Sequence, residues 1–150
     1  MRTPQCASVR GMRYALIAAL ALGAVAAQAI PQKTEKRKIP CKTPEIAASC
    51  YWIRGRLSIY NGNPSLRVWK IGTKHLLGIY SGPSTFPPRT SEDSESPELP
   101  ANLETLDDAL DGGEIFADFE VCPIRPEHPH QMQPACIESA KNIFVHRSGR

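Results

Sequence analysis

The fold is decided by residues 50–80, which read CYWIRGRLSIYNGNPSLRVWKIGTKHLLGIY. Apolar and polar side chains alternate on both sides of residues 61–64, and this NGNP segment carries strong turn chemistry. A four-residue loop there sets the register of a hairpin, in which Leu57 lies opposite Val68. The apolar positions of both strands then share one face, so the hairpin can bury that face.

A third strand follows the hairpin. Gly72 and Thr73 mark a second turn, and residues 75–80 form another strand-like segment, so the sequence predicts a meander of three antiparallel strands. The expected core of this meander consists of Leu57, Ile59, Leu66, Val68, Leu77 and Ile79.

The second half of the chain supplies the remaining elements. Leucines at helical spacing in residues 99–110 predict a short amphipathic helix. Residues 115–122 and 135–146 predict a fourth and a fifth strand. We therefore expect a mainly β fold with one or two short helices, either a small five-stranded antiparallel barrel of the OB-like kind or a small sandwich. The barrel is favoured because closure hides strand edges.

The N-terminus has the three parts of a secretory signal peptide. Residues 1–13 are basic and lack acids, residues 14–27 are almost wholly apolar, and residues 27–29 form an A-x-A site. Cleavage behind that site removes residues 1–29, and synthesis from Met12 leaves an equally complete signal. An uncleaved anchor is disfavoured, because the apolar run reaches about 21 Å as a helix, against about 30 Å of hydrocarbon.

The formal net charge of +3 belongs to the signal peptide, whose three arginines account for the excess. Charge is segregated in the chain that remains. Residues 30–90 hold eleven basic and two acidic side chains, whereas residues 91–150 hold four basic and thirteen acidic ones. The two halves have opposite fields, and each can be the partner of the other.

The mature chain is predicted to be one domain with two polar segments. Residues 30–42 form a basic arm around prolines, which we expect to be flexible. Residues 81–98 are rich in Pro, Ser and acidic residues, and they predict a long exposed loop. Residues 43–150 are expected to form a single β-rich domain, because the part after the acidic loop is too short to fold alone.

Four cysteines remain after removal of the signal peptide, an even number in a small exported domain. We favour the disulfide pairs Cys41–Cys50 and Cys122–Cys136, because each closes a local loop, and each bridge contributes roughly 2 to 4 kcal/mol. A four-thiolate zinc site is disfavoured, since eight and thirteen intervening residues are unlike the short knuckles of such sites.

The candidate binding residues are five side chains expected on the outer face of the hairpin, namely Trp52, Arg54, Arg56, Arg67 and Trp69. Arginine–tryptophan pairs provide cation–π contacts and fork-shaped donors for phosphate or carboxylate. Strand faces of this composition hold single-stranded nucleic acid or sugars in OB-folds. Two alternatives stay open: the acidic half of the chain covers this face, or both tryptophans belong to the core.

The sequence contains no G-x-S-x-G, H-E-x-x-H, P-loop or dinucleotide fingerprint. With the cysteines assigned to disulfides, we predict no catalytic residue, no cofactor and no metal ligand. His128 and His130, with Glu127 beside them, are the basis of an alternative. That alternative is a periplasmic metal-binding protein or a small extracytoplasmic enzyme.

Three segments carry a resemblance: residues 55–69 (GRLSIYNGNPSLRVW), 118–123 (DFEVCP) and 136–140 (CIESA). They resemble small exported proteins of Gram-negative bacteria that have no assigned function. The resemblance implies residence in the periplasm or secretion, and nothing about activity. We therefore expect an exported binding or interaction module that is not an enzyme. It is expected to be a monomer without a stable membrane span after processing, and to bind an anionic ligand or another envelope protein.

Overall fold

A computed structural model describes residues 37–147, so the predicted signal peptide, residues 1–29, lies outside the described residues. Five strands are present in this part: β1 (Tyr51–Ile59), β2 (Leu66–Lys70), β3 (Leu76–Ile79), β4 (Gly113–Pro123) and β5 (Gln133–Arg147). The remaining elements are single turns: the helices α1 (Glu92–Glu95), α2 (Ala101–Glu104) and α3 (Asp107–Leu110), and the 3-10 turns η1 (Ala47–Ser49) and η2 (Pro83–Thr85).

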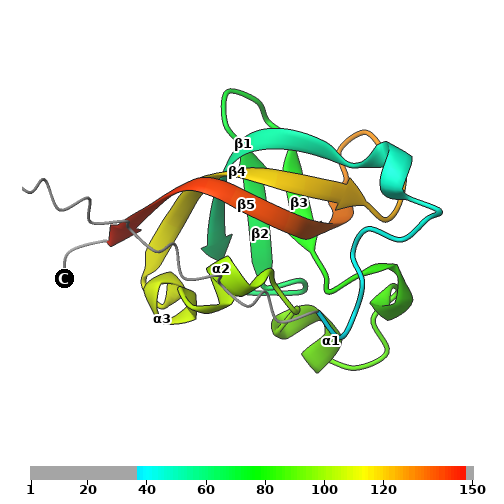
Figure 1. The fold of residues 1–150 in the computed structure, drawn as a ribbon, viewed down its shortest axis with the longest axis horizontal. Coiled ribbons are helices and arrows are strands. Elements are labelled where there is room, and N and C mark those ends of the chain that lie inside the picture. The colour runs from blue at the N-terminus through cyan, green and yellow to red at the C-terminus, as the bar shows by residue number, and fades with distance from the viewer. Residues whose placement is uncertain (1–36, 148–150) are drawn as a thin grey trace, which may run out of the picture. The chain divides into compact units, whose positions relative to one another are not determined.

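The strands form one closed ring in the order β1-β2-β3-β5-β4, with β4 returning to β1 (Figure 1). The mainly β class with five strands is confirmed. Neighbouring strands are antiparallel except β3 and β5, which pair in parallel from Leu77 with Gln133 to Ile79 with Ala135. The predicted antiparallel arrangement thus holds for four of the five neighbouring pairs, and the fifth is parallel because directions can alternate around a closed ring only when the number of strands is even.

The predicted hairpin register is confirmed, with Leu57 paired to Val68 and Arg56 paired to Trp69. Five of the six predicted core residues of the meander are buried, whereas Ile59 is 50% exposed. Ile59 is the last residue of β1, and the pairing of β1 with β4 ends two residues earlier at Leu57. The prediction for Ile59 is wrong because no second strand covers that end of β1.

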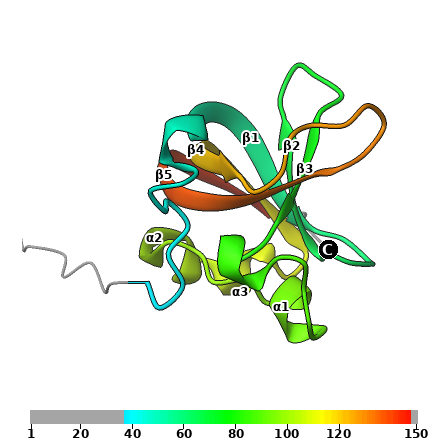
Figure 2. The same cartoon turned by 90° about the vertical axis from the view of Figure 1, so that its right-hand side faces the viewer.

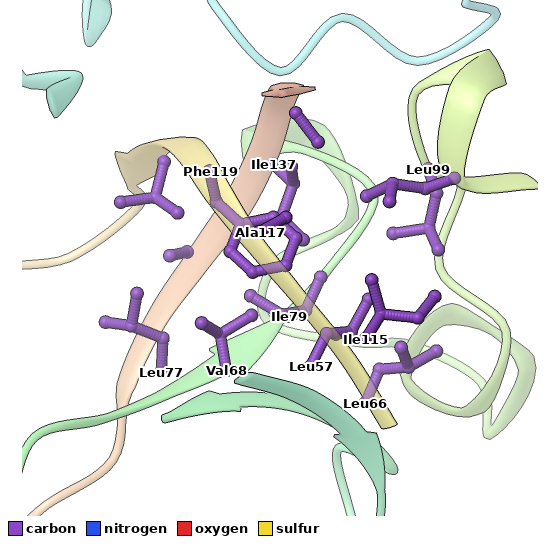
Figure 3. Close-up of a cluster of buried hydrophobic side chains, with 14 of the residues drawn as sticks. Leu57, Leu66, Val68, Leu77, Ile79, Leu99, Ile115, Ala117, Phe119 and Ile137 are labelled. Atoms are coloured by element: carbon purple, nitrogen blue, oxygen red, sulfur yellow. The ribbon is translucent and has the colours of Figure 1, made fainter. Parts of the chain in front are cut away.

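The interior of the ring holds one cluster of fully buried side chains to which every strand contributes (Figure 3). Examples in strand order are Leu57, Val68, Ile79, Phe119 and Ile137. This cluster is the main hydrophobic core of the described part of the chain, and a smaller one surrounds Cys41, Cys122 and Cys136.

The connection between β3 and β4 closes one end of the ring (Figure 2). Leu103 of α2 and Leu110 of α3 are buried in the core cluster. The segment expected to form one helix over residues 99–110 forms two single turns instead. They are separated at Leu106, whose N–H bonds to the carbonyl oxygen of Leu103 in the tighter three-residue spacing.

The disulfides join Cys41 to Cys136 and Cys50 to Cys122, with Cα–Cα distances of 5.7 and 4.1 Å. The predicted pairing within each half of the chain is therefore wrong. Strand β1 pairs with β4 and sets Tyr51 opposite Val121, which brings Cys50 next to Cys122. Cys136 lies opposite Cys122 on β5 and is left to bind Cys41 of the arm. The pairing follows from contacts between distant strands.

The described part of the arm is held by Arg37. Its guanidinium donates to the carbonyl oxygens of Ile137, Ser81 and Glu98, the last two at 2.7 Å. In return, the Glu98 carboxylate accepts the backbone N–H groups of residues 38–39 at 2.7 and 2.8 Å. Burial lowers the pKa of the Arg37 guanidinium from its ordinary value, while Glu98 acts in the opposite direction. One side chain thus ties the arm to β5 and to the acidic segment.

The acidic segment, residues 81–98, packs at the β1–β2 turn. Ser94 and Pro97 are buried in it, although both were expected in an exposed loop. Ser65, the residue before β2, donates its N–H to the Ser94 carbonyl oxygen at 3.2 Å and its hydroxyl to the Glu95 carbonyl oxygen at 2.8 Å. The segment is therefore anchored at the turn end of the hairpin, whereas Trp52 and Trp69 lie toward the opposite end.

The disulfide pairing is testable by peptide mapping of the oxidised protein. Cleavage after glutamate at Glu45 and Glu127 separates the cysteines of each half of the chain. We expect linked peptides that join Cys41 to Cys136. Replacing these two cysteines by serine should lower the free energy of unfolding by about 2 to 5 kcal/mol in a urea titration, because the bridge closes a long loop. A peptide linking Cys41 to Cys50 contradicts the pairing.

The hydrogen bonds from Arg37 to three carbonyl groups, here called the Arg37 clamp, lead to a second prediction about stability. Arg37→Ala should lower the free energy of unfolding by about 2 kcal/mol, because buried carbonyl groups lose a charged donor. The free energy of unfolding of Arg37→Lys should lie between those of the wild type and Arg37→Ala, since a single ammonium cannot reproduce the planar fork of donors. Lys38→Ala removes an exposed side chain and serves as the control, with a change within about 0.5 kcal/mol. Equal urea midpoints for the two alanine variants would falsify the clamp.

Candidate binding face

The outer surface of β2, β1, β4 and β5 carries large aromatic and basic side chains in register. Arg56 pairs with Trp69 on one side and with Phe116 on the other, and Phe116 pairs with Phe144 of β5. One row across the strands therefore runs Trp69, Arg56, Phe116 and Phe144. We call this surface the arginine–aromatic face, and its members are Trp52, Arg54, Arg56, Trp69, Ile71, Phe116 and Phe144.

Several large apolar side chains of this face are open to solvent. The exposed fractions are 60% for Phe144, 45% for Trp52 and Ile71, and 40% for Trp69. Neither tryptophan belongs to the core, which removes one of the two alternatives left by the sequence. Patches of this kind are uncommon on monomeric proteins unless they bind something.

Four of the five predicted site residues come together on this face, and Arg67 does not. Its guanidinium lies 5.1 Å from the centre of the Tyr60 ring. It also donates to the carbonyl oxygens of Pro64 at 3.0 Å and Asn61 at 3.3 Å. Arg67 therefore supports the β1–β2 turn.

Three members of the face were not predicted from the sequence. Phe116 alternates with buried residues of β4, so strict period-two counting along that strand would have placed it outside. Ile71 follows the end of β2, and Phe144 follows an irregularity in the pairing of β4 with β5. No local pattern indicates that either of them meets Phe116.

Acidic side chains of β4 neutralise the arginines of β1. Arg56 Nη1 lies 3.0 Å from Glu114 Oε1, and Arg54 Nη1 lies 3.4 Å from Asp118 Oδ1. The pKa of Asp118 is lowered by the hydrogen bond from the Asn142 amide and, to a smaller extent, by Arg54. The basic and acidic halves of the chain thus meet on adjacent strands, and the face is polar but without a large excess of positive charge.

Cations also back both tryptophans. The Arg56 guanidinium lies 4.9 Å from the centre of the Trp69 ring, and Lys141 Nζ lies 4.0 Å from that of Trp52. The indole N–H of Trp69 donates to the Thr73 carbonyl oxygen at 2.6 Å. These contacts fix the orientation of each ring while leaving part of it exposed.

A shallow groove crosses the face. One depression of about 420 Å³ and a second of about 180 Å³ share Ile71 and Phe116 in their walls. Phe144 and Arg54 line the first, and Trp69 lines the second. The groove runs across the strands and has apolar walls with charged groups beside them.

The histidine loop lies in a separate depression. His128 and His130 line it together with His75 and Met132. His75 uses both ring nitrogens in other contacts, Nδ1 at 2.9 Å from Glu127 and Nε2 at 3.1 Å from the Gln133 side chain. Within residues 37–147, no group of three or more His, Cys, Asp or Glu side chains is arranged to hold a metal ion. The geometry of the described residues does not add support to the metal-binding alternative.

No family model, curated protein or solved structure matches this chain. None of the helices within residues 37–147 has the length and apolar character needed to cross a membrane. Function is therefore inferred from the geometry of the arginine–aromatic face.

The neutralised arginines predict weak binding of polyanions. Replacing Glu114 by Gln and Asp118 by Asn frees both arginines, so the affinity for short oligothymidylate should rise several-fold at low salt and fall more steeply as salt increases. The matched control, Glu92→Gln with Glu95→Gln, changes the net charge equally in the distant helix α1. Fluorescence anisotropy of labelled oligothymidylate measures both variants. Equal gains would show that net charge, and not the freed arginines, controls binding.

Proposed function

We propose that this protein is an exported interaction module that holds another protein surface on its arginine–aromatic face, and that it has no catalytic role. The observation that carries the proposal is the exposure of Trp52, Trp69, Ile71 and Phe144 on one side of a ring whose core is filled elsewhere. Aromatic residues and arginine are the types most enriched at the centres of protein–protein interfaces.

Charge favours a protein surface over an anionic ligand. The arginines that would grip phosphate are bonded to Glu114 and Asp118. A polyanion would have to displace these carboxylates, whereas a mixed protein surface can pair with both signs. We therefore expect the face to bind the anionic ligand predicted from the sequence less tightly than a protein surface.

We propose further that the ring is an OB-like barrel. The strand order β1-β2-β3-β5-β4 and the position of the helices between β3 and β4 support this. OB-folds bind ligands on the outer face of strands 2 and 3. Here a Cβ on Gly78 of β3 would lie 2.7 Å from Pro64 and 3.2 Å from Met132, so the chain's own loops cover the outer surface of β3 at this position. The outer surface that remains open runs from Trp69 of β2 across β1 to β4.

Export is supported by two independent features. The four cysteines of the described part form two disulfides, which persist in oxidising compartments. The N-terminal sequence has the pattern of a cleaved signal peptide. We therefore place the module in the periplasm or outside the cell.

Site-specific photocrosslinking in the producing cell tests the proposed face. A photoreactive residue in place of Ile71 is expected to give a discrete adduct of higher mass, because Ile71 lies in both depressions. The same residue in place of Glu92, exposed on α1, is the matched control and should give no such adduct. Absence of an adduct at Ile71, or the same adducts at both positions, would contradict the interaction function.

A further inference from the structure

We infer that the partner of the arginine–aromatic face is a second copy of this chain, packed face to face about a two-fold axis that runs along the strands between β1 and β4. This inference rests on the proposed function, since it assigns an occupant to the same face. It replaces the monomer expected from the sequence, and it follows from how charge and aromatic rings are ordered across the four strands.

Opposite charges stand in two adjacent columns on the face. Arg54 and Arg56 form the β1 column, and Glu114 and Asp118 belong to the β4 column. A two-fold axis along the strands between β1 and β4 exchanges these columns. The basic column of each copy then faces the acidic column of the other, so the face is complementary to itself in charge.

The large side chains of the face also form complementary pairs about this axis. The axis reverses the row that runs from Trp69 on β2 through Arg56 and Phe116 to Phe144 on β5. Trp69 then meets Phe144 of the second copy, and Arg56 meets Phe116 of the second copy. These are an aromatic pair and a cation–π pair, and each occurs twice in a dimer. Phe144 and Trp69, two exposed apolar side chains of the face, are thus covered by the second copy.

Pairing through the edge of β5 fits less well. Within the described residues, β3 pairs with β5 only from Gln133 to Ala135, so no strand lies along the later part of that edge. Antiparallel pairing of two such edges about Phe144 sets Lys141 opposite Arg147 of the second copy. Like charges in direct opposition are destabilising. The charge pattern therefore favours the face over the edge.

Charge exchange between two variants tests the inference. Arg54→Asp makes both columns acidic at one row, and Asp118→Arg makes both columns basic at the same row. Each variant alone is expected to sediment as a monomer. An equimolar mixture is expected to dimerise, because the acidic row of one variant meets the basic row of the other. Only a contact between copies can produce this rescue, and circular dichroism checks that each variant is folded.

A second pair of variants tests the aromatic contact. Phe144→Ser should raise the dissociation constant of the dimer by at least about tenfold, since two large apolar side chains lose their partners. Ile59→Ser is the matched control, because Ile59 is similarly exposed at 50% but lies outside the face. It should leave the dissociation constant unchanged in sedimentation velocity.

Wild-type protein that remains a monomer at high micromolar concentration overturns the inference. So does a dimer that survives Phe144→Ser, or a mixture of the charge variants that stays monomeric. If the dimer tests fail in any of these ways but the photoreactive residue at Ile71 captures a different protein, the proposed function is still supported. When that position gives no adduct, the proposed function fails as well. An adduct of twice the mass of the chain supports both.

Discussion

Closure of the sheet with five strands is the constraint on which the rest of the structure depends. An odd ring cannot alternate in direction throughout, so one neighbouring pair must be parallel, and here it is β3 with β5. Strand β5 lies between β3 and β4 in the ring, so the chain cannot pass from β3 to β4 by a tight turn. The long connection must cross the open end of the ring, and it carries Leu103 and Leu110 into the core as it does so. A segment with little apolar sequence thereby becomes part of the fold.

Closure also decides the electrostatics of the outer surface. It makes β1 and β4 neighbours, although one belongs to the basic half of the chain and the other to the acidic half. The ion pairs Arg54–Asp118 and Arg56–Glu114 follow directly from that adjacency. Partly exposed ion pairs contribute little to stability. These two pairs leave the face nearly neutral, so that aromatic rings are its dominant feature.

The features that could be predicted from the sequence are those set by residues close together in the chain. The register of the hairpin was accessible because the NGNP turn and the apolar alternation agree within a short segment. The disulfides were not, because Cys50 meets Cys122 only after β1 has paired with β4. Phe144 was missed for the same reason. Its neighbour Phe116 lies on another strand, and the register between the two strands shifts next to this pair. Contacts between distant segments limit prediction here more than residue type does.

Rigidity of the face follows from where its residues are anchored. Most of them lie on strands; the Cys50–Cys122 disulfide ties the start of β1 to β4, and the Cys41–Cys136 disulfide and the Arg37 clamp hold the arm to the ring. The Trp52 and Trp69 rings are held by Lys141 and Arg56. A surface ordered in this way gives up little side-chain entropy when it binds, so its exposed apolar area is converted to affinity with small loss. A preformed partner surface is therefore favoured over a flexible chain, and the second copy proposed above has a face that is ordered in the same way.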